Sequence, residues 1–428
     1  MFGLGKLGAC LVASLANSGH TVTGFDPSAD AVKAINSASP LVFEPGLAEI
    51  LARNISRIRG LTSADEALAE SEAAFVIVPT PSSVHGDFKN DYVLKALEAI
   101  GENLRANPRP FTVVISSTVM PGSCDSEFVP LLERVSGLKV GDNLGLAYSP
   151  EFIALGSILQ DMQFPDLILI GESDSAAGDV VQQIALSMVK NSPSVQRMSL
   201  ASAEVTKIAI NTFVTTKISF ANMLGEICDQ IPGTDIDNVT SAVGSDRRVG
   251  SSYLKAALGY GGPCFPRDNA ALAFAAESRG VGADIARATD SINRRQVDRI
   301  VDIVLKNSKL KDTVGVVGLA YKPNTPVTDS SEALEIAHRL SQSGRHVIGF
   351  DPLVAGTETA TTAKDLVVTG DSSLLSSASV IVLANPELDF QSQGDIPPTT
   401  VIIDLWGANS VKAITVVRPG RQHVKETI

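Results

Sequence analysis

The chain has 428 residues, of which 44% are hydrophobic and 19% charged, so it can bury sizeable cores and form two or three domains. Its formal net charge of −12, with no basic cluster, argues against a nucleic-acid partner. The cysteines lack the spacing of a zinc site or a disulfide framework, and no apolar run reaches the roughly 18 residues of a membrane span. These features predict a cytoplasmic protein without a metal site or a membrane segment.

A glycine-rich turn stands at the start of the chain. Gly3-Leu4-Gly5-Lys6-Leu7-Gly8 is a GxGxxG motif, followed by a helical pattern, a short strand and Asp26. The glycines permit a tight turn, the approach of backbone to a pyrophosphate, and the packing of helix on strand. Asp26 stands where an acidic side chain binds the adenosine ribose and repels a 2′-phosphate, which predicts NAD rather than NADP. The alternative is a plain βα turn, in which Asp26 only opens the turn before Pro27.

Little sequence precedes this motif. Only Met1 and Phe2 stand where the fold has its central strand, and loss of that strand would expose the backbone and apolar surface of its neighbours. We therefore expect the natural chain to begin upstream, or the sequence to be truncated.

The two halves of the chain resemble each other. SGHTVTGFDP at 18–27 is echoed by SGRHVIGFDP at 343–352, FVIVP at 75–79 by VIVLA at 380–384, and TVVISS at 112–117 by TVIIDL at 400–405. Short β-branched runs separated by helical patterns are typical of βαβ units, so each half is expected to form a doubly wound parallel sheet.

The segment between the halves lacks strand signals. Residues 203–227 carry apolar side chains at helical spacing, which predicts a long helix, in a linker or in a domain that joins two subunits. The length of the segment favours the second. We therefore expect an α/β fold with a NAD-binding Rossmann domain at 1–197, a central helical dimerisation domain at 198–298 and a second Rossmann-like domain at 299–428.

A cysteine lies in a glycine-rich loop of this central segment. In GYGGPCFPRD at 259–268, the glycines are expected to bring bare backbone N–H groups near a ligand. Pro266 is placed to begin a helix, which puts Cys264 at the helix N-terminus, where the reactive thiolate is favoured. Asp268, one turn later on the same face, is placed to act as a base or to orient water. The other cysteines, Cys10, Cys124 and Cys228, are expected to be small buried residues.

The predicted long helix carries Glu204, Lys207 and Asn211 about one turn apart. A Lys and an Asn that converge can stabilise an oxyanion. The alternative is an exposed helix face with an ion pair between Glu204 and Lys207.

The second half has a different first loop. The segment GLAYKP at 318–323 is not a GxGxxG motif, and the stretch that leads to Ser343-Gly344 is longer than its counterpart. We do not expect it to seat a dinucleotide in the same way, but it could hold a second nucleotide ligand with Lys322 facing phosphate.

Together these residues resemble the UDP-glucose/GDP-mannose dehydrogenase family along essentially the whole chain. The matching segments are GLGKLG at 3–8, VPTP at 78–81, SSTVMPG at 116–122, SPEF at 149–152, PDLILIG at 165–171, AEVTKIAIN at 203–211, DRRVG at 246–250, GYGGPCFPRD at 259–268 and GLAYKPNT at 318–325.

The resemblance implies an NAD-dependent nucleotide-sugar 6-dehydrogenase. Such an enzyme oxidises the C6 alcohol of a UDP-sugar to a uronate in two NAD reductions at one site, through a cysteine thiohemiacetal and thioester, for polysaccharide precursor synthesis. The implied catalytic residues are Cys264 as nucleophile, Lys207 and Asn211 at the oxyanion, and Asp268, Thr118 and Glu151 for protons and water. The implied cofactor contacts are Gly3, Gly5, Lys6, Leu7, Gly8, Asp26, Thr80 and Thr118.

Substrate contacts are implied in the same way for Glu151, Phe152, Lys207, Asn211, Tyr253, Gly261 and Lys322. Arg248 is implied to reach the substrate across the interface of a homodimer. The third domain, 299–428, then becomes the UDP-binding one.

Two positions depart from the family pattern. Leu155 stands where the UDP-glucose enzymes have a second Glu, and Asp329 stands where many members have an Arg that faces the cofactor. UDP-glucose and a UDP-N-acetylhexosamine therefore compete as the substrate.

Two other functions remain as alternatives. A β-hydroxyacid-type dehydrogenase also joins a Rossmann domain to helices, but it needs neither the cysteine nor a second α/β half. A catalytically silent nucleotide-sugar-binding protein would keep the pockets without turnover. The set of Cys264, Lys207, Asn211 and Asp268 argues against it.

Overall fold

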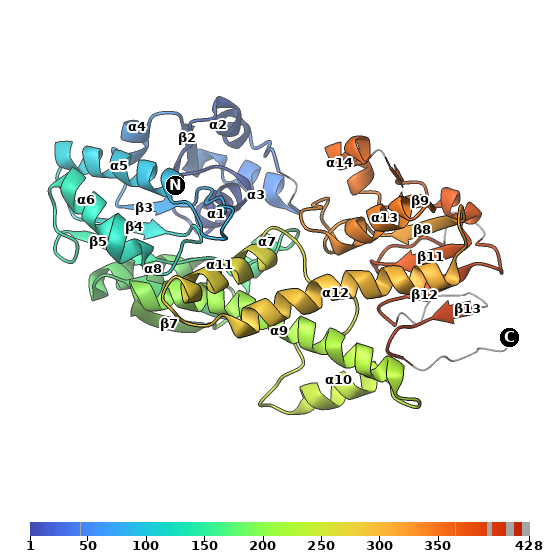
Figure 1. Cartoon of the computed structure of the whole chain (residues 1–428). Coiled ribbons are helices and arrows are strands. Elements are labelled where there is room, and N and C mark those ends of the chain that lie inside the picture. Colours follow the sequence, from blue (N-terminus) through green and yellow to red (C-terminus); the bar gives the residue numbers. More distant parts are fainter. Residues whose placement is uncertain (43, 364, 392–395, 408–414, 422–428) are drawn as a thin grey trace. The chain divides into compact units, whose positions relative to one another are not determined.

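The computed structural model describes residues 1–428 except 43, 364, 392–395, 408–414 and 422–428. The chain forms two compact units, Met1–Ala209 and Ile210–Ile428 (Figure 1). The boundary lies within the 31-residue helix α9 (Leu200–Gln230), which confirms the long helix predicted over 203–227.

A largely parallel sheet forms the centre of the N-terminal unit. Its strands are β1 (Val22–Phe25), β2 (Ile58–Leu61), β3 (Ala73–Val76), β4 (Phe111–Ile115), β5 (Leu144–Tyr148), β6 (Leu167–Glu172) and β7 (Ser194–Ser199). β1 pairs with β2, and β3 to β7 follow one another in order. The β5–β6 pair is antiparallel and the other strand pairs of this unit are parallel.

The first two residues occupy the central position of this sheet. Phe2 forms parallel bridges to Phe25 and to Val76, and so it joins β1 to β3. Its N–H donates to the Phe75 carbonyl and its carbonyl accepts from the Ile77 N–H, at 2.7 and 2.9 Å. This two-residue segment therefore bridges β1 and β3 at the place where a doubly wound sheet has its central strand.

Helices cover both faces of the sheet. They are α1 (Lys6–Asn17), α2 (Ala29–Asn36), α3 (Leu47–Arg53), η1 (Ile55–Arg57), α4 (Ala64–Leu68), α5 (Asp91–Ala106), η2 (Cys124–Phe128), α6 (Val129–Ser136), α7 (Ile158–Gln163) and α8 (Ser175–Met188). Side chains of α5 and α6 form one buried cluster with the sheet, and those of α1, α3 and α7 form another. Two apolar layers around one sheet are the doubly wound arrangement.

The C-terminal unit begins with helices and ends with a second parallel sheet. After its part of α9 come α10 (Ile236–Ser245), α11 (Phe265–Glu277) and α12 (Asp284–Asn307). The strands are β8 (Thr313–Val317), β9 (His346–Phe350), β10 (Val367–Thr369), β11 (Val380–Leu383), β12 (Val401–Asp404) and β13 (Thr415–Val417), with α13 (Glu332–Gln342), η3 (Val354–Gly356), α14 (Glu358–Thr362) and η4 (Ser372–Ser377) between them. Their order is β10-β9-β8-β11-β12-β13, and the pairs are parallel.

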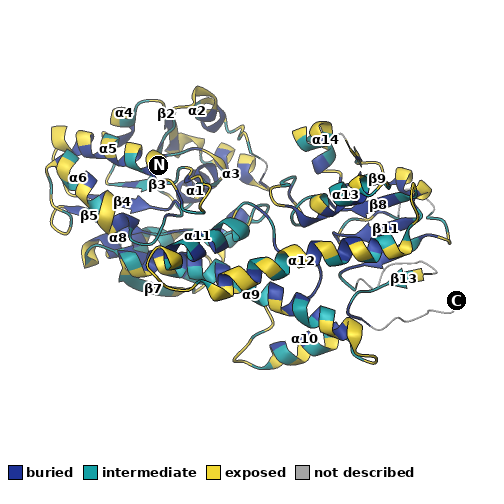
Figure 2. Cartoon of the chain, viewed as in Figure 1, coloured by how far each residue is buried: buried dark blue, intermediate teal, exposed yellow. Residues whose placement is uncertain are grey.

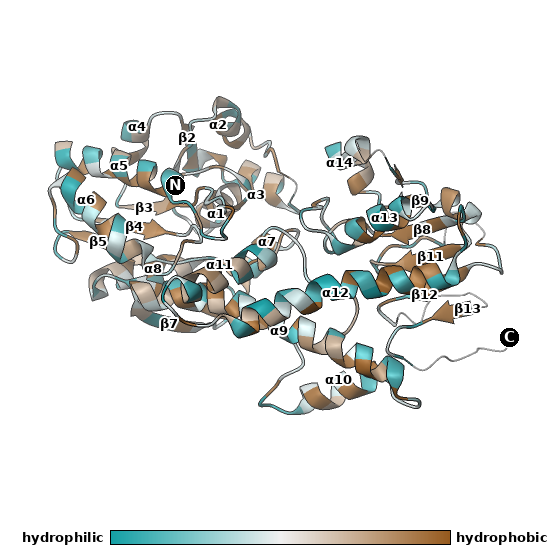
Figure 3. Cartoon of the chain, in the orientation of Figure 1, coloured by the Kyte–Doolittle hydropathy of each residue, from teal (hydrophilic) through white to brown (hydrophobic). Residues whose placement is uncertain are grey.

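Burial and hydropathy explain why these segments form strands. The central strands are buried (Figure 2) and apolar (Figure 3), and β11 is buried at each of its four positions. Continuous apolar runs of this kind are typical of strands covered on both faces. Two Rossmann-like sheets and a helical middle confirm the predicted fold class.

The repeat in the sequence corresponds to a repeated turn. In the first unit the Leu4 N–H donates to Asp26 Oδ2 at 2.8 Å, and in the second the Leu319 N–H donates to Asp351 Oδ2 at 2.9 Å. Each acidic residue follows the second strand of its βαβ unit and holds the turn that follows the first.

In the described part of the chain, no helix is long and apolar enough to span a membrane.

Candidate active site

The glycines of the first turn have different surroundings. Gly3 has φ +99°, and a Cβ there would overlap the Ile77 carbonyl oxygen. A Cβ on Gly8 would overlap the Gly3 carbonyl oxygen, because the start of α1 is packed against the turn. Gly5 is exposed, and a Cβ there would meet no atom within 4 Å. Gly3 and Gly8 are therefore required by packing, while Gly5 leaves open space in front of the α1 N-terminus, as a bound pyrophosphate requires.

Asp26 is oriented by the turn it faces. Its Oδ2 accepts from the Leu4 N–H at 2.8 Å and its Oδ1 from the Ser28 N–H at 2.9 Å. Each carboxylate oxygen can accept more than one hydrogen bond, so capacity remains for two ribose hydroxyls. Lys6 and Leu7 form the first turn of α1 beside it. These residues fit the adenosine and pyrophosphate of NAD.

The loops after β3 and β4 are joined to each other. Thr80 Oγ1 donates to the Thr118 carbonyl at 2.7 Å. Ser117 Oγ accepts from the Val78 N–H and donates to the Val78 carbonyl, both at 2.8 Å. The sequence predicted roles for Thr80 and Thr118 but none for Ser117, although it lies in the SSTVMPG motif. Both predicted residues thus lie at the carboxyl end of the sheet, beyond β3 and β4.

Lys207, Glu151 and Phe152 form a cluster in the N-terminal unit. Lys207 is buried, and its Nζ donates to the Glu151 carbonyl at 2.6 Å and lies 4.4 Å from the centre of the Phe152 ring. Burial raises the pKa of the Glu151 carboxyl to about 7, an effect that the positive charge of Lys207 opposes. A carboxyl that titrates near neutral pH can act as a base or an acid.

The structure rules out the exposed-face alternative for α9. Glu204 is fully buried and Lys207 is 7% exposed, so this face of α9 is not a solvent-exposed one. The Glu204 carboxylate accepts from the Gly122 N–H at 2.5 Å and from the Cys124 N–H at 2.8 Å. Glu204 therefore binds the end of the segment that carries Thr118.

Cys264 is the exposed cysteine, and Cys10, Cys124 and Cys228 are buried, as predicted. It is the N-cap of α11, with Pro266 in the first turn, which confirms its predicted position at a helix N-terminus. The Asp268 N–H donates to the Cys264 carbonyl at 2.8 Å. Asp268 is buried, and its Oδ2 accepts from Asn211 Nδ2 at 2.6 Å. The C-terminal unit thus brings Asn211 and Asp268 together at the helix that Cys264 begins.

Two of the glycines of the cysteine loop, Gly259 and Gly262, do not have the bare N–H groups that the sequence predicted. A Cβ on Gly259 would overlap Asn293 and Glu332, and one on Gly261 would overlap the Ser330 carbonyl. Gly262, at φ +82°, lies against the Tyr321 ring. The three glycines therefore have contacts with protein that require the absence of a side chain, and the N–H groups of Gly259 and Gly262 donate to Glu332 and to the Asp329 carbonyl.

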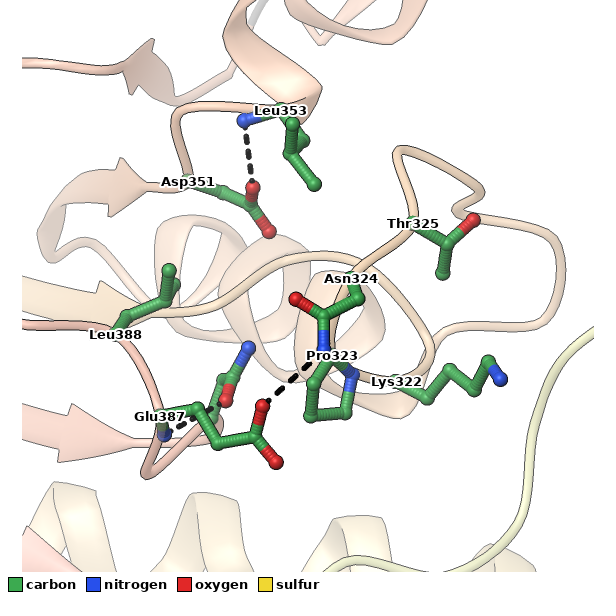
Figure 4. Close-up of a pocket in the computed structure, with 9 residues that line it drawn as sticks. Lys322, Pro323, Asn324, Thr325, Asp351, Leu353, Glu387 and Leu388 are labelled. Carbon is green, nitrogen blue, oxygen red and sulfur yellow. Dashed lines mark hydrogen bonds between the residues drawn. The ribbon is translucent and has the colours of Figure 1, made fainter. Parts of the chain in front are cut away.

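A small pocket lies at the carboxyl edge of the second sheet (Figure 4). Its volume is about 120 Å³, and it is lined by residues from the loops after β8, β9 and β11: Lys322, Pro323, Asn324, Thr325, Asp351, Leu353, Asn385, Glu387 and Leu388. The order of strands reverses between β8 and β11, and open α/β sheets bind ligands at such a point. The predicted contact Lys322 is therefore placed on the rim of a pocket.

Arg248 and Tyr253 lie on the surface of the C-terminal unit. Arg248 forms an ion pair with Asp246 at 2.7 Å. Tyr253 is 56% exposed with φ +60°, and its ring is 6.4 Å from that of Phe265. Neither side chain is held in a buried position within its own unit.

Comparison with known proteins identifies the relationship. Models of the UDP-glucose/GDP-mannose dehydrogenase family match the chain at 1–188 (NAD binding domain), 201–295 (central domain) and 315–410 (UDP binding domain). A UDP-glucose 6-dehydrogenase of Haloferax volcanii is 35% identical over 357 residues, which cover 82% of this chain and 83% of the relative. The chain belongs to the UDP-glucose/GDP-mannose dehydrogenase family.

Further relatives extend over nearly the whole chain. A GDP-mannose 6-dehydrogenase of Azotobacter vinelandii is 33% identical over 429 residues, covering 95% of this chain and 96% of the relative. The solved structure of a UDP-glucose dehydrogenase from Pyrobaculum islandicum has a TM-score of 0.86 at 32% identity and covers 97% of this chain and 95% of that one. The predicted family is thus confirmed, and so is the prediction that the chain is an NAD-dependent nucleotide-sugar 6-dehydrogenase.

The two departures from the family pattern have distinct surroundings. Leu155 packs against the apolar cluster around α1 and α7. Asp329 is exposed, and its backbone carbonyl accepts from the Gly262 N–H at 2.9 Å. An acidic side chain in place of an arginine thus lies beside the cysteine loop of this family member.

Proposed function

We propose that the chain oxidises the C6 alcohol of a UDP-sugar to the carboxylate in two NAD-dependent steps, with Cys264 as the covalent nucleophile. The observation that carries this proposal is the environment of Cys264. It is exposed at the N-terminus of α11, one turn before the buried Asp268, while the other cysteines are buried. A helix N-terminus favours a thiolate, and an accessible thiolate is a strong nucleophile.

The first oxidation needs a cofactor that accepts hydride and a group that handles the alcohol proton. Gly5, Asp26 and the α1 N-terminus would hold NAD, which supplies the hydride acceptor when bound. Lys207, buried beside Glu151, polarises the C6 oxygen and, with Asn211, stabilises the negative charge that develops on it. The alcohol loses a hydride and a proton and becomes the aldehyde.

The second oxidation proceeds through the thiol. The Cys264 sulfur forms a bond to the aldehyde carbon, and the carbonyl oxygen takes a proton, which gives a thiohemiacetal. Loss of a second hydride and proton gives a thioester. Water then breaks the C–S bond, so that the products are the carboxylate, the free thiol and a proton, with two NAD reduced per sugar.

Two carboxyl groups support the proton transfers. Glu151 has a pKa raised to about 7 by burial, so near neutral pH it can accept a proton from the water that attacks the thioester. Asp268 is held by Asn211 and orients water or accepts a proton, with Thr118 as a further positioning group.

The nucleotide of the substrate is assigned to the second unit. The match of its sheet to a UDP binding domain, and the pocket with Lys322 on its rim, support this assignment. The relatives include UDP-glucose and GDP-mannose enzymes at similar identity, 35% and 33%, so identity alone does not select the base. We propose UDP, with glucose or an N-acetylhexosamine as the sugar.

A homodimer is part of this proposal. Phe213, Phe220 and Ile227 recur every seven residues on α9 and are 65%, 43% and 46% exposed. Seven residues are almost two helical turns, so these side chains form one apolar stripe, of the kind that packs against another helix. In the dimer, Arg248 contacts the substrate of the partner subunit.

The test combines stoichiometry with a pair of cysteine variants. NADH formed per sugar consumed is measured with UDP-glucose, UDP-galactose, UDP-GlcNAc, UDP-GalNAc, UDP-ManNAc and GDP-mannose. We expect about two NADH per sugar with one UDP-sugar. Cys264→Ala is expected to abolish uronate formation, while Cys228→Ala, a buried control on α9, retains it. Uronate release by Cys264→Ala at the wild-type rate would remove the covalent mechanism.

The panel also separates the remaining alternatives. Turnover with GDP-mannose alone would overturn the choice of UDP. Binding of a nucleotide sugar without any NADH would support the silent binding protein.

A further inference from the structure

The loop that precedes Cys264 is held by buried polar side chains. Asn222, on α9, accepts from the Ala257 N–H at 3.0 Å and donates to the Leu258 carbonyl at 3.1 Å. Asn293, on α12, accepts from the Tyr260 N–H at 2.8 Å and donates to the Tyr260 carbonyl at 2.9 Å. Successive peptide groups are thus bound by separate helices, which leaves the loop little freedom.

Glu332 holds the residue between these two bonded pairs. It is the first residue of α13 and is 8% exposed, and its Oε2 accepts from the Gly259 N–H. Its Oε1 is buried and has no hydrogen-bond partner among the described residues. Gly259 lacks a side chain where one would overlap Glu332 and Asn293, so this carboxyl approaches the loop backbone directly.

The segment around Glu332 is bonded to both functional loops of the unit. The Asp329 carbonyl accepts from the Gly262 N–H at 2.9 Å, which is a second link to the cysteine loop. Ser331 Oγ donates to the Leu319 carbonyl at 2.7 Å, which is a link to the start of the loop that carries Lys322. Residues 329–332 therefore connect the loop of the nucleotide pocket to the loop of the cysteine.

We propose that Glu332 is a positioning residue for the oxidation: it fixes Gly259 so that the cysteine loop presents Cys264 at the start of α11. The proposal rests on the proposed role of Cys264 as nucleophile. A buried N–H that loses its acceptor costs more than the bond itself is worth, so removal of the carboxyl displaces the loop. A displaced thiol reacts more slowly, because attack on a carbonyl depends steeply on position.

A simpler role for Glu332 is to stabilise α13 through the helix dipole, and a second acidic residue on the same helix serves as a control for it. An acidic residue in the first turn stabilises a helix through its dipole, and α13 has a second one, Glu335. Glu335 is exposed and pairs with Arg339 at 2.6 Å, whereas Glu332 is buried and accepts from the cysteine loop. If the dipole accounted for Glu332, the variants Glu332→Ala and Glu335→Ala would behave alike.

The experiment compares Glu332→Ala, Glu332→Gln and Glu335→Ala in the full chain. kcat and KM are measured with the accepted nucleotide sugar, and the alkylation rate of Cys264 by iodoacetamide is measured without ligands by mass spectrometry of its peptide. We expect Glu332→Ala to lower kcat by at least about tenfold and to slow alkylation several-fold, with KM for NAD changed less than about twofold. Glu332→Gln keeps an oxygen acceptor for Gly259 and is expected to stay within about threefold of wild type. Glu335→Ala is expected to match wild type.

Several results would overturn the proposal. Glu332→Ala with wild-type kcat and alkylation rate is one, and Glu332→Gln as impaired as Glu332→Ala is another. If Glu332→Ala does not fold, Glu332→Asp replaces it, because aspartate keeps the acidic first turn but is too short for the bond to Gly259. The alkylation arm does not depend on turnover. Uronate formation by Cys264→Ala would therefore refute the covalent role of Cys264, whereas slowed alkylation in Glu332→Ala would still show that Glu332 positions the cysteine loop.

Discussion

Gly5 and Gly8 allow cofactor binding to be separated from folding by two single-methyl substitutions. In Gly5→Ala the new Cβ meets no protein atom within 4 Å, and the backbone at φ −69° suits any residue. Its stability is expected to stay within about 0.5 kcal/mol of wild type. In Gly8→Ala the Cβ overlaps the Gly3 carbonyl oxygen, which belongs to a turn fixed by the sheet. Overpacking against rigid backbone costs about 3 kcal/mol.

Affinity for NAD is expected to depend on Gly5, the position at which the substitution leaves stability nearly unchanged. The methyl of Gly5→Ala occupies the space in front of the α1 N-terminus, and the loss of close contact with the pyrophosphate is expected to raise Kd for NAD at least about tenfold. Thermal unfolding and NAD titration by calorimetry measure the two quantities on the same samples. Gly5→Ala with unchanged Kd would refute the assignment of this turn, and a fully stable Gly8→Ala would refute the packing argument.

Further predictions concern three acidic residues. Asp26→Asn keeps a hydrogen-bond acceptor but loses the negative charge that repels a 2′-phosphate. In steady-state assays the ratio of kcat/KM for NAD to kcat/KM for NADP should therefore fall at least about tenfold. An unchanged ratio would contradict the role of Asp26. Glu332 has its pKa raised by burial from 4.5 to about 8, so its neutral form stabilises the fold below about pH 4.5 and this contribution is lost as pH rises to about 8. Across that window Glu332→Gln should therefore become more stable than wild type, by on the order of 4 kcal/mol at pH 8. Denaturant titrations at several pH values measure this, and a difference in unfolding free energy that does not change with pH would refute it. Glu204→Gln keeps one carbonyl oxygen, so one of the N–H groups of Gly122 and Cys124 loses its acceptor, which should cost about 1–3 kcal/mol in the same titrations and lower kcat. An unaltered midpoint would show that the bond is dispensable.

The fold could be predicted because its signals are local. β-branched runs such as 112–117 and 380–384 form strands wherever both faces are covered, and a repeated pattern implies a repeated βαβ unit. The turn with Asp26 is local in the same sense, since strand, glycines and acid lie within one unit. The division into domains at 198 and 299 stays a prediction, and so do the catalytic roles.

The surroundings of the site could not be predicted, because they join distant parts of the sequence. Glu204 binds backbone at 122 and 124, and Glu332 binds backbone at 259, so no spacing pattern reports either contact. The glycines of the cysteine loop were attributed to a ligand, and the sequence did not report that Gly259 and Gly261 are also required by side chain and backbone brought close in the fold. A sequence motif thus identifies residues that are required, but it does not show which contacts require them.

The duplicated turn has a consequence for inhibition. Asp351 occupies the place of Asp26 in the second sheet, but it is 3% exposed and accepts from the N–H groups of Leu319, Ala320, Leu353 and Val354. These bonds use the lone pairs that a ribose would need. In the second half the acidic side chain is thus used for internal structure, and we expect the reduced cofactor not to bind there. Product inhibition by NADH should therefore compete with NAD alone and never with the sugar nucleotide.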